Sequence, residues 1–405
     1  MRGSTAGLPD TFQGNGTTYY TLITVLDLLF SALIVCPCVV GYWRSVWTLM
    51  DIYVVPENQL VSAVISTCVG LCGHLFFLLF QKVLEGHFHP DKNRILYYLV
   101  SRLYTACFAF ICVNGWRGPW DLLTVHTEKD FKSLFVTTSV GLVALISMRA
   151  LRNVSSPPCV IVNDTVKGYF EVITMFRIPV SGRVSFFILD CIFSVVIVGT
   201  LVVFIWRGLW IMVDIFLFPD DPEASAHGSL ILGYSIIAVL FIMQPIVRNV
   251  CNKLSGAARL LFADLFIIVC LVGTINVWRG IWMCLDIYFL PDNKVLSCWI
   301  TLTVSLVLLI LLGCSNSLLV RGVYIDAEEP DGKCVVLPCY YLRIIFQAEK
   351  LKKINKKMQM YEKPEKLDNI ENNHIVTISG IVDEDDCGGI DNRANSDILK
   401  GLDVP

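Results

Sequence analysis

The chain has 405 residues, of which 55% are hydrophobic and 17% charged, and its formal net charge is −3. The mean hydropathy of +0.63 is too high for an ordinary soluble domain and predicts a membrane protein. The charge pattern gives no support to nucleic-acid binding. The 16 cysteines are scattered without the spacing of a metal site or a disulfide framework, so we expect no metal and no other cofactor.

Segments of about 20 apolar residues, long enough to cross a bilayer, recur along the chain. They predict an all-α membrane protein with eight transmembrane helices and a partly disordered cytoplasmic tail. The first span lacks a basic, cleavable leader and is expected to remain as an anchor. The predicted spans are 20–42, 59–81, 95–115, 131–150, 184–206, 228–248, 258–278 and 295–315.

The orientation follows from Lys and Arg in the short loops. The loops that join one predicted hairpin to the next are richer in these residues than the loops inside the hairpins. Both termini are therefore expected to be cytoplasmic. With this orientation the sequons at Asn15, Asn153 and Asn163 are cytoplasmic and unused.

A repeated segment marks four hairpins in tandem. Its copies are WRSVWTLMDIYVVPEN from Trp43, WRGPWDLLTVHTEKDF from Trp116, WRGLWIMVDIFLFPDD from Trp206 and WRGIWMCLDIYFLPDN from Trp278. The first and third copies are separated by nearly the same distance as the second and fourth. This spacing favours a hairpin that was doubled, with the pair then doubled again. Pro56, Pro219 and Pro291 end the repeated element, and Asn58 and Asn293 stand at the expected N-caps of the following spans.

We interpret the repeat as an element of the membrane interface, where Trp side chains find both apolar and polar surroundings. The Arg can stack on indole or reach phosphate, and Gly in three copies allows close backbone approach. Arg and Asp lie seven residues apart, on one helical face, and could pair within a copy or between copies. The second copy departs from the pattern with Pro119 and Thr124. The motif residues are Trp43, Arg44, Trp47 and Asp51; Trp116, Arg117 and Trp120; Trp206, Arg207, Trp210 and Asp214; and Trp278, Arg279, Trp282 and Asp286.

Two hypotheses account for these charged residues. The first is a structural clamp that holds each hairpin against its neighbour, because charges within a membrane need partners. The second is a ring of four Arg around a pseudo-symmetric axis that attracts or gates anions.

A second set of charged residues lies within the odd-numbered spans: Asp27, Arg102, Asp190 and Asp264. Such residues normally face protein or water. One hypothesis is a latch in which three acids and one base complement each other at the axis. The alternative is a cation or proton path with Arg102 as a tethered counter-ion.

After the last span, the basic amphipathic helix YYLRIIFQAEKLKKINKKM is expected to lie on anionic lipid, with Cys334 and Cys339 as candidate palmitoylation sites.

The predicted organisation has five parts. They are a cytoplasmic N-terminal segment (1–19), a first half with two hairpins (20–154), a cytoplasmic linker (155–183), a second half with two hairpins (184–320), and a cytoplasmic basic helix with a disordered tail (321–405).

Over residues 20–325 the WRGxW-type hairpins and their Asp-Ile-aromatic endings resemble the fuseless family of multi-pass membrane proteins. The resemblance implies a protein of the presynaptic plasma membrane that supports localisation of voltage-gated calcium channels and calcium-dependent synaptic vesicle exocytosis. It supplies no site residues. No catalytic constellation is visible, so we expect a non-enzymatic scaffold or trafficking protein. The alternative is an ion channel, or an ion- or proton-coupled transporter, that uses the buried Asp residues.

Overall fold

The computed structural model describes residues 17–179, 182–330, 332–346 and 352–353. Residues 1–341 form one compact unit and residues 342–405 a second, in which 342–346 and 352–353 are helical. The first compact unit thus extends beyond the boundary predicted at residue 321, because part of the chain after α11 (Lys294–Leu311) packs within it. The sequon Asn15, most of the predicted basic helix and the predicted disordered tail lie outside the described residues.

The regular secondary structure in the described part of the first unit is helical, and no strand occurs there. Two of its helical segments contain a π-helical turn, at equivalent places in the first and third repeats. The elements are α2 (Thr17–Phe30), η1 (Ser31–Val35), α3 (Cys36–Tyr53), α4 (Gln59–His87), α5 (Arg94–His126), α6 (Phe131–Ser147), η2 (Leu151–Val154), α7 (Val184–Ile192), η3 (Phe193–Val198), α8 (Gly199–Phe216), α9 (Pro222–Lys253), α10 (Gly256–Tyr288), α11 (Lys294–Leu311), η4 (Ser315–Leu318) and η5 (Lys333–Val335).

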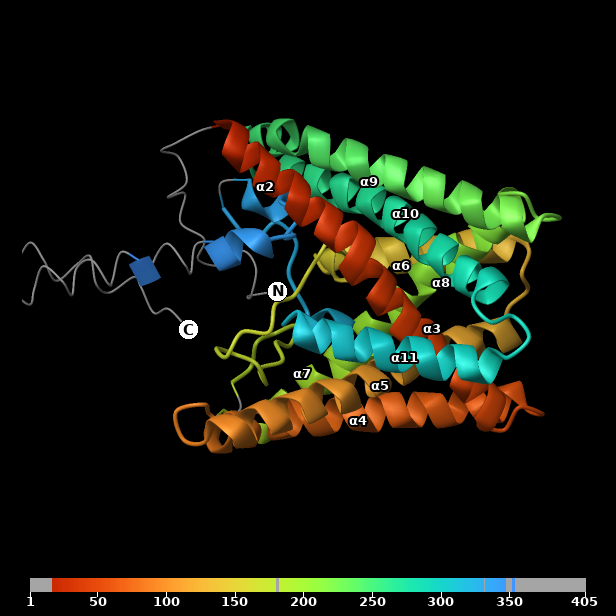
Figure 1. Ribbon diagram of the computed structural model, residues 1–405, viewed down its shortest axis with the longest axis horizontal. Coiled ribbons are helices and arrows are strands. Elements are labelled where there is room, and N and C mark those ends of the chain that lie inside the picture. Colours follow the sequence, from red (N-terminus) through yellow and green to blue (C-terminus); the bar gives the residue numbers. More distant parts are fainter. Residues whose placement is uncertain (1–16, 180–181, 331, 347–351, 354–405) are drawn as a thin grey trace, which may run out of the picture. The chain divides into compact units, whose positions relative to one another are not determined.

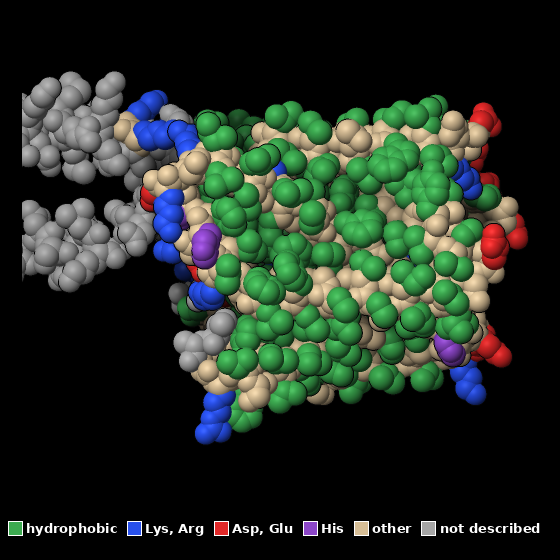
Figure 2. Space-filling model, turned by 90° about the horizontal axis from the view of Figure 1, so that it is seen from below, with side chains coloured by type: hydrophobic (Ala, Val, Ile, Leu, Met, Phe, Trp, Pro, Cys, Tyr) green, Lys and Arg blue, Asp and Glu red, His purple; other side chains and the backbone are tan. Residues whose placement is uncertain are grey.

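Seven of the described helices are long and apolar enough to cross a membrane, and α6 is a shorter apolar helix. The chain is therefore a multi-pass helical membrane protein. Figure 2 shows hydrophobic side chains along the lateral face of the molecule. Lys and Arg gather at the end where α2 begins, and Asp and Glu gather mainly at the opposite end.

The helices that carry the repeated motif continue well beyond the predicted spans. The predicted spans end at 42, 115, 206 and 278, whereas α3, α5, α8 and α10 end at Tyr53, His126, Phe216 and Tyr288. The predicted ends were too early because the Trp-Arg segment does not stop the helix, and α5 continues even through Pro119 of the second copy. Three of the four helices stop three residues before a proline, which is unfavourable within a helix.

The loops after the motif repeat one backbone conformation. Val55, Phe218 and Leu290 each have positive φ and each directly precedes the proline. The next helix then begins at a side-chain cap. Asn58 Oδ1 accepts a hydrogen bond from the Val61 N–H, and Asn293 Oδ1 accepts one from Leu296. The two predicted N-caps are confirmed, and Asp130 and Asp221 cap α6 and α9 in the same manner.

The inner helices α3, α5, α8 and α10 carry the motif, and the outer helices α4, α6, α9 and α11 pack around them. In Figure 1, α4 lies beside α5 and α9 lies beside α10. The inner helices contact one another in the order α3, α5, α8, α10 and back to α3. Each inner helix packs most extensively against the outer helix of the preceding repeat: α5 against α4, α8 against α6, α10 against α9, and α3 against α11. The tightest helix pairs therefore form between consecutive repeats rather than within one hairpin.

The outer helices α6 and α11 are short, and the chain that follows each of them folds into the bundle. Residues at the start of these segments, such as Leu151, Ile161 and Leu318, are fully buried. The segments 148–179 and 312–341, of which residue 331 is not described, are called the inserted segments. Both contribute buried residues to the hydrophobic core, and the first of them includes most of the predicted linker.

Candidate functional site

The first tryptophan of each motif lies in a closed ring at the centre of the bundle. Trp43, Trp116, Trp206 and Trp278 pack edge to face, with centroid distances of 5.3 Å for three of the contacts and 5.7 Å for the fourth, between Trp43 and Trp278. This perpendicular geometry is favourable because the positive ring edge meets the negative ring face.

The second tryptophan of each motif forms a second closed ring. Trp47, Trp120, Trp210 and Trp282 pack edge to face at 5.5 to 6.0 Å. The predicted role of the motif tryptophans as anchors in the lipid headgroup layer is wrong, because none of the eight is exposed. Their i, i+4 spacing places each pair on one helical face, as expected, but that face is directed at the bundle axis.

Three of the motif arginines form ion pairs with the motif aspartate of the preceding repeat. Arg44 Nη2 lies 2.7 Å from Asp286 Oδ1, Arg117 Nη2 lies 2.8 Å from Asp51 Oδ1, and Arg279 Nε lies 2.6 Å from Asp214 Oδ1. Of the two pairings left open by the sequence, the structure has the one between copies. The pairs run in one direction around the ring and link its neighbouring helices.

Serines of the outer helices complete the arginine contacts. Arg117 donates to Ser66 Oγ at 2.6 Å and to Ser62 Oγ at 2.8 Å. Arg279 makes the equivalent contacts with Ser229 at 2.5 Å and Ser225 at 2.7 Å. Arg44 donates to Ser297 Oγ at 3.3 Å. Each of these arginines is therefore held by both helices of the preceding repeat.

The fourth motif arginine, Arg207, has different partners from the other three. Arg207 Nε donates to the Thr124 hydroxyl at 3.1 Å, where the other copies have a carboxylate. Leu134 occupies the α6 position that corresponds to Ser62 of α4. Arg207 Nη2 is buried and has no hydrogen-bond partner among the described residues.

Small residues at the third motif position set the close packing of inner and outer helices. A Cβ atom on Gly118 would lie 2.3 Å from Thr67 Oγ1, and one on Gly208 would lie 1.8 Å from Thr138 Oγ1. A Cβ atom on Gly280 would lie 2.6 Å from Leu230 Cγ. These approaches agree with the reason proposed for glycine in three of the four copies.

Three of the four charged residues within the spans contact the inserted segments rather than one another, and the fourth, Asp264, is buried with no hydrogen-bond partner among the described residues. Asp190 accepts hydrogen bonds from the Thr174 hydroxyl and from the N–H groups of Phe176 and Ile178. Asp27 Oδ1 accepts one from the N–H of Tyr341. The hypothesis that the three acids and the base complement each other at one axis is thus corrected, because the backbone of the inserted segments supplies these contacts.

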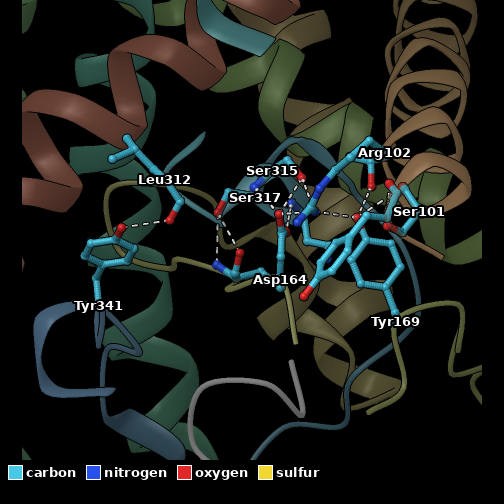
Figure 3. Close-up of polar contacts among 12 residues, drawn as sticks. Ser101, Arg102, Asp164, Tyr169, Leu312, Ser315, Ser317 and Tyr341 are labelled. Atoms are coloured by element: carbon cyan, nitrogen blue, oxygen red, sulfur yellow. Dashed lines mark hydrogen bonds and ion pairs between the residues drawn. The ribbon is translucent and has the colours of Figure 1, made fainter. Parts of the chain in front are cut away.

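Arg102 contacts the inserted segment that follows α6. Its Nη1 lies 2.5 Å from Asp164 Oδ2 and 3.1 Å from the hydroxyl of Tyr169 (Figure 3). Asp164 also accepts hydrogen bonds from the N–H groups of Ser315 and Asn316, at the start of η4. Asp164 therefore ties the segment after α6 to the segment after α11.

Asp326 has the reciprocal role in the other half. Its carboxylate accepts hydrogen bonds of 2.7 Å from the N–H groups of Leu151 and Arg152, at the start of η2. Burial raises the pKa of Asp326, and these hydrogen bonds act in the opposite direction. Each half of the chain thus supplies an aspartate that caps a 3₁₀-helix of the other half.

The tryptophan rings also contact the inserted segments. Trp43 Nε1 donates to the Leu318 carbonyl at 3.1 Å, and Trp206 Nε1 donates to the Val154 carbonyl at 3.0 Å. Trp278 Nε1 donates to the Pro157 carbonyl at 2.7 Å. The first ring therefore has the second ring on one side and inserted backbone on the other.

Comparison with known families finds a match between residues 22–319 and the Fuseless family model. The chain belongs to the Fuseless family. The matched residues include all four tryptophan-arginine segments, both rings and the whole first inserted segment. Comparisons with curated proteins and with solved structures give no match.

Several residues of this Fuseless-family site were missed from the sequence. The serines of α4, α9 and α11 follow the N-cap residue by four positions, with a second hydroxyl four positions later in each helix, and this pattern is visible in the sequence. Asp164 and Asp326 have no comparable signal. No cluster of His, Cys, Asp or Glu in the described part of the chain could hold a metal ion. Cys334 and Cys339 are buried, which disfavours palmitoylation in this conformation.

Proposed function

We propose that this protein is a non-enzymatic scaffold or trafficking protein of the presynaptic plasma membrane. It would support localisation of voltage-gated calcium channels and calcium-dependent synaptic vesicle exocytosis, the role implied by resemblance to the fuseless family. The proposal includes eight spans in four tandem hairpin repeats, with α6 as the shortest span and both termini in the cytoplasm. The gathering of Lys and Arg at the end where α2 begins favours this orientation (Figure 2).

The observation that carries the scaffold proposal is the pair of closed tryptophan rings. Eight indoles occupy the axis around which the inner helices are arranged. Below them, the inserted segments are hydrogen-bonded to the first ring. A transport site in a helical membrane protein is typically built from broken helices around a cavity near the midplane. A packed axis suits a rigid scaffold better than a conduit.

A truncation tests the scaffold proposal. Removing residues 342–405 leaves the whole first compact unit, so we expect the protein to reach the plasma membrane at its normal level. Channel clusters at active zones and evoked release should be reduced, because we propose that the removed C-terminal segment recruits the partner proteins and that its basic helix contacts anionic lipid. The measurement combines channel imaging with recordings of evoked release. The proposal fails if the truncated chain restores both to the level of the full chain in neurons that lack the protein.

Ion- or proton-coupled transport is the alternative function, and one observation favours it. Asp264 is 2% exposed, and neither carboxyl oxygen has a hydrogen-bond partner among the described residues. A buried acid of this kind is a candidate proton or cation carrier. Asp27 and Asp190 are less suitable, because both hold an inserted segment.

The transport alternative predicts ion or proton flux in vesicles that contain the purified full chain, and Asp264→Asn should abolish it. The scaffold proposal predicts background flux for both proteins. Matched folding of the two chains, checked by size-exclusion profile, is the control. Flux that depends on Asp264 would establish transport in place of the packed-axis interpretation.

A further inference from the structure

The ring of ion pairs contains one buried guanidinium without a neighbouring carboxylate. Arg207 is 1% exposed, as deeply buried as the other three motif arginines. Each of those has a motif carboxylate within ion-pair distance, whereas Arg207 has a threonine hydroxyl. A buried charge is strongly unfavourable unless an opposite charge and hydrogen bonds compensate it.

Two substitutions in the second repeat remove the usual partners of this arginine. Thr124 replaces the aspartate, and its hydroxyl already donates to the Trp120 carbonyl. Leu134 replaces the first serine of the outer helix, and the hydroxyl of Thr138 donates to the Leu134 carbonyl. Arg207 Nη2 is consequently left with no acceptor in the described chain.

Asp121 does not take the place of the missing carboxylate. It lies one helical turn before Thr124 and is 3.5 Å from Arg117 Nε, so Arg117 has two acids beside it. The charge of Asp121 acts on Arg207 only from a greater distance, since no ion pair joins them in the described part of the chain. The ring is close to neutral as a whole but short of negative charge at Arg207.

We infer that Arg207 binds a small monovalent anion of the halide class, in the position that a motif carboxylate occupies in the other repeats. The anion reaches Arg207 from the end of the molecule where the motif carboxylates lie. The side chains of those carboxylates, Asp286, Asp51 and Asp214, are 41%, 51% and 44% exposed. A small anion is favoured over a larger one because Gly208 packs directly against Thr138 and Arg207 itself is almost fully buried. This anion completes the ring of ion pairs, and it is independent of the proposed presynaptic role.

The test uses the full chain in nanodiscs, prepared in sodium gluconate, whose anion is too large for the site. Replacing gluconate with chloride or bromide at constant ionic strength should raise the Tm of the natural chain by roughly 2 to 5 °C, with saturation. Thr124→Asp supplies the missing carboxylate. It should raise the Tm in gluconate by a similar amount and abolish the halide response.

Two further variants serve as controls. Thr124→Asn has nearly the shape of Thr124→Asp without the charge, so it should keep the halide response. Asp121→Asn removes the nearest acid, so it should lower the half-maximal halide concentration by roughly 3- to 10-fold. The inference is overturned if the natural chain melts equally in gluconate and halide. It is also overturned if Thr124→Asp keeps the full response, or if only Asp121→Asn responds, because Asp121 is then the counter-ion of Arg207.

Discussion

Replacing Arg117 with methionine will destabilise the protein by about 3 kcal/mol, whereas the same change at Arg207 in halide-free buffer will cost about 1 kcal/mol or less. Arg117 holds Asp51, Ser62 and Ser66 together, so its loss removes an ion pair and two charged hydrogen bonds between helices. Arg207 makes one hydrogen bond, to Thr124, and its loss relieves an uncompensated buried charge.

Thermal or SDS unfolding of the full chain in sodium gluconate measures this difference. Arg279→Met is the matched repeat, because Arg279 makes the same aspartate and serine contacts as Arg117 in the other half of the chain, without the additional contact of Arg117 with Asp121. Arg279→Met should lower the free energy of unfolding by the same amount as Arg117→Met, to within about 1 kcal/mol, given the spread of such measurements. Equal losses at Arg117 and Arg207 would show that the carboxylate and serine contacts do not set the stability of the ring.

The local features of the fold could be predicted because short-range chemistry determines them. The N-caps Asn58 and Asn293 follow from amide side chains placed directly before an apolar run. Three of the motif helices end at the predicted prolines for a similarly local reason. The glycines of the motif were interpreted correctly as points of close helix approach.

The partners of the motif residues could not be predicted, because apolar periodicity does not distinguish a lipid-facing side from a protein-facing side in a membrane helix. The tryptophans were consequently assigned to the headgroup layer. The inserted segments were interpreted as a linker and a tail, since a stretch such as Cys159–Val162 has no helical or strand context that indicates burial. The serines near Arg117 and Arg279 were predictable in principle, had the repeat been followed into the outer helices.

The second large effect is expected at the tryptophan rings. Trp206→Ala should lower stability by about 3 to 5 kcal/mol, and Trp299→Ala by about 1 kcal/mol or less, as measured by unfolding in nanodiscs. Trp206 is 2% exposed and packs against two other indoles, whereas Trp299 is 51% exposed on the outer surface of α11. Trp206→Phe should fall between the two, because it keeps most of the packing but leaves the Val154 carbonyl without its donor.

The size of the Trp206 effect tests whether the rings are the structural centre of the molecule. Lipid chains are as apolar as leucine, so helices in a bilayer associate through close packing and hydrogen bonds rather than through the hydrophobic effect. A lost indole at the axis leaves a cavity that lipid cannot fill, and it also releases the segment 151–154 from the ring. A lost indole at Trp299 is replaced by lipid. If Trp206→Ala costs no more than Trp299→Ala, the rings do not hold the bundle together, and the arginine network carries its stability instead.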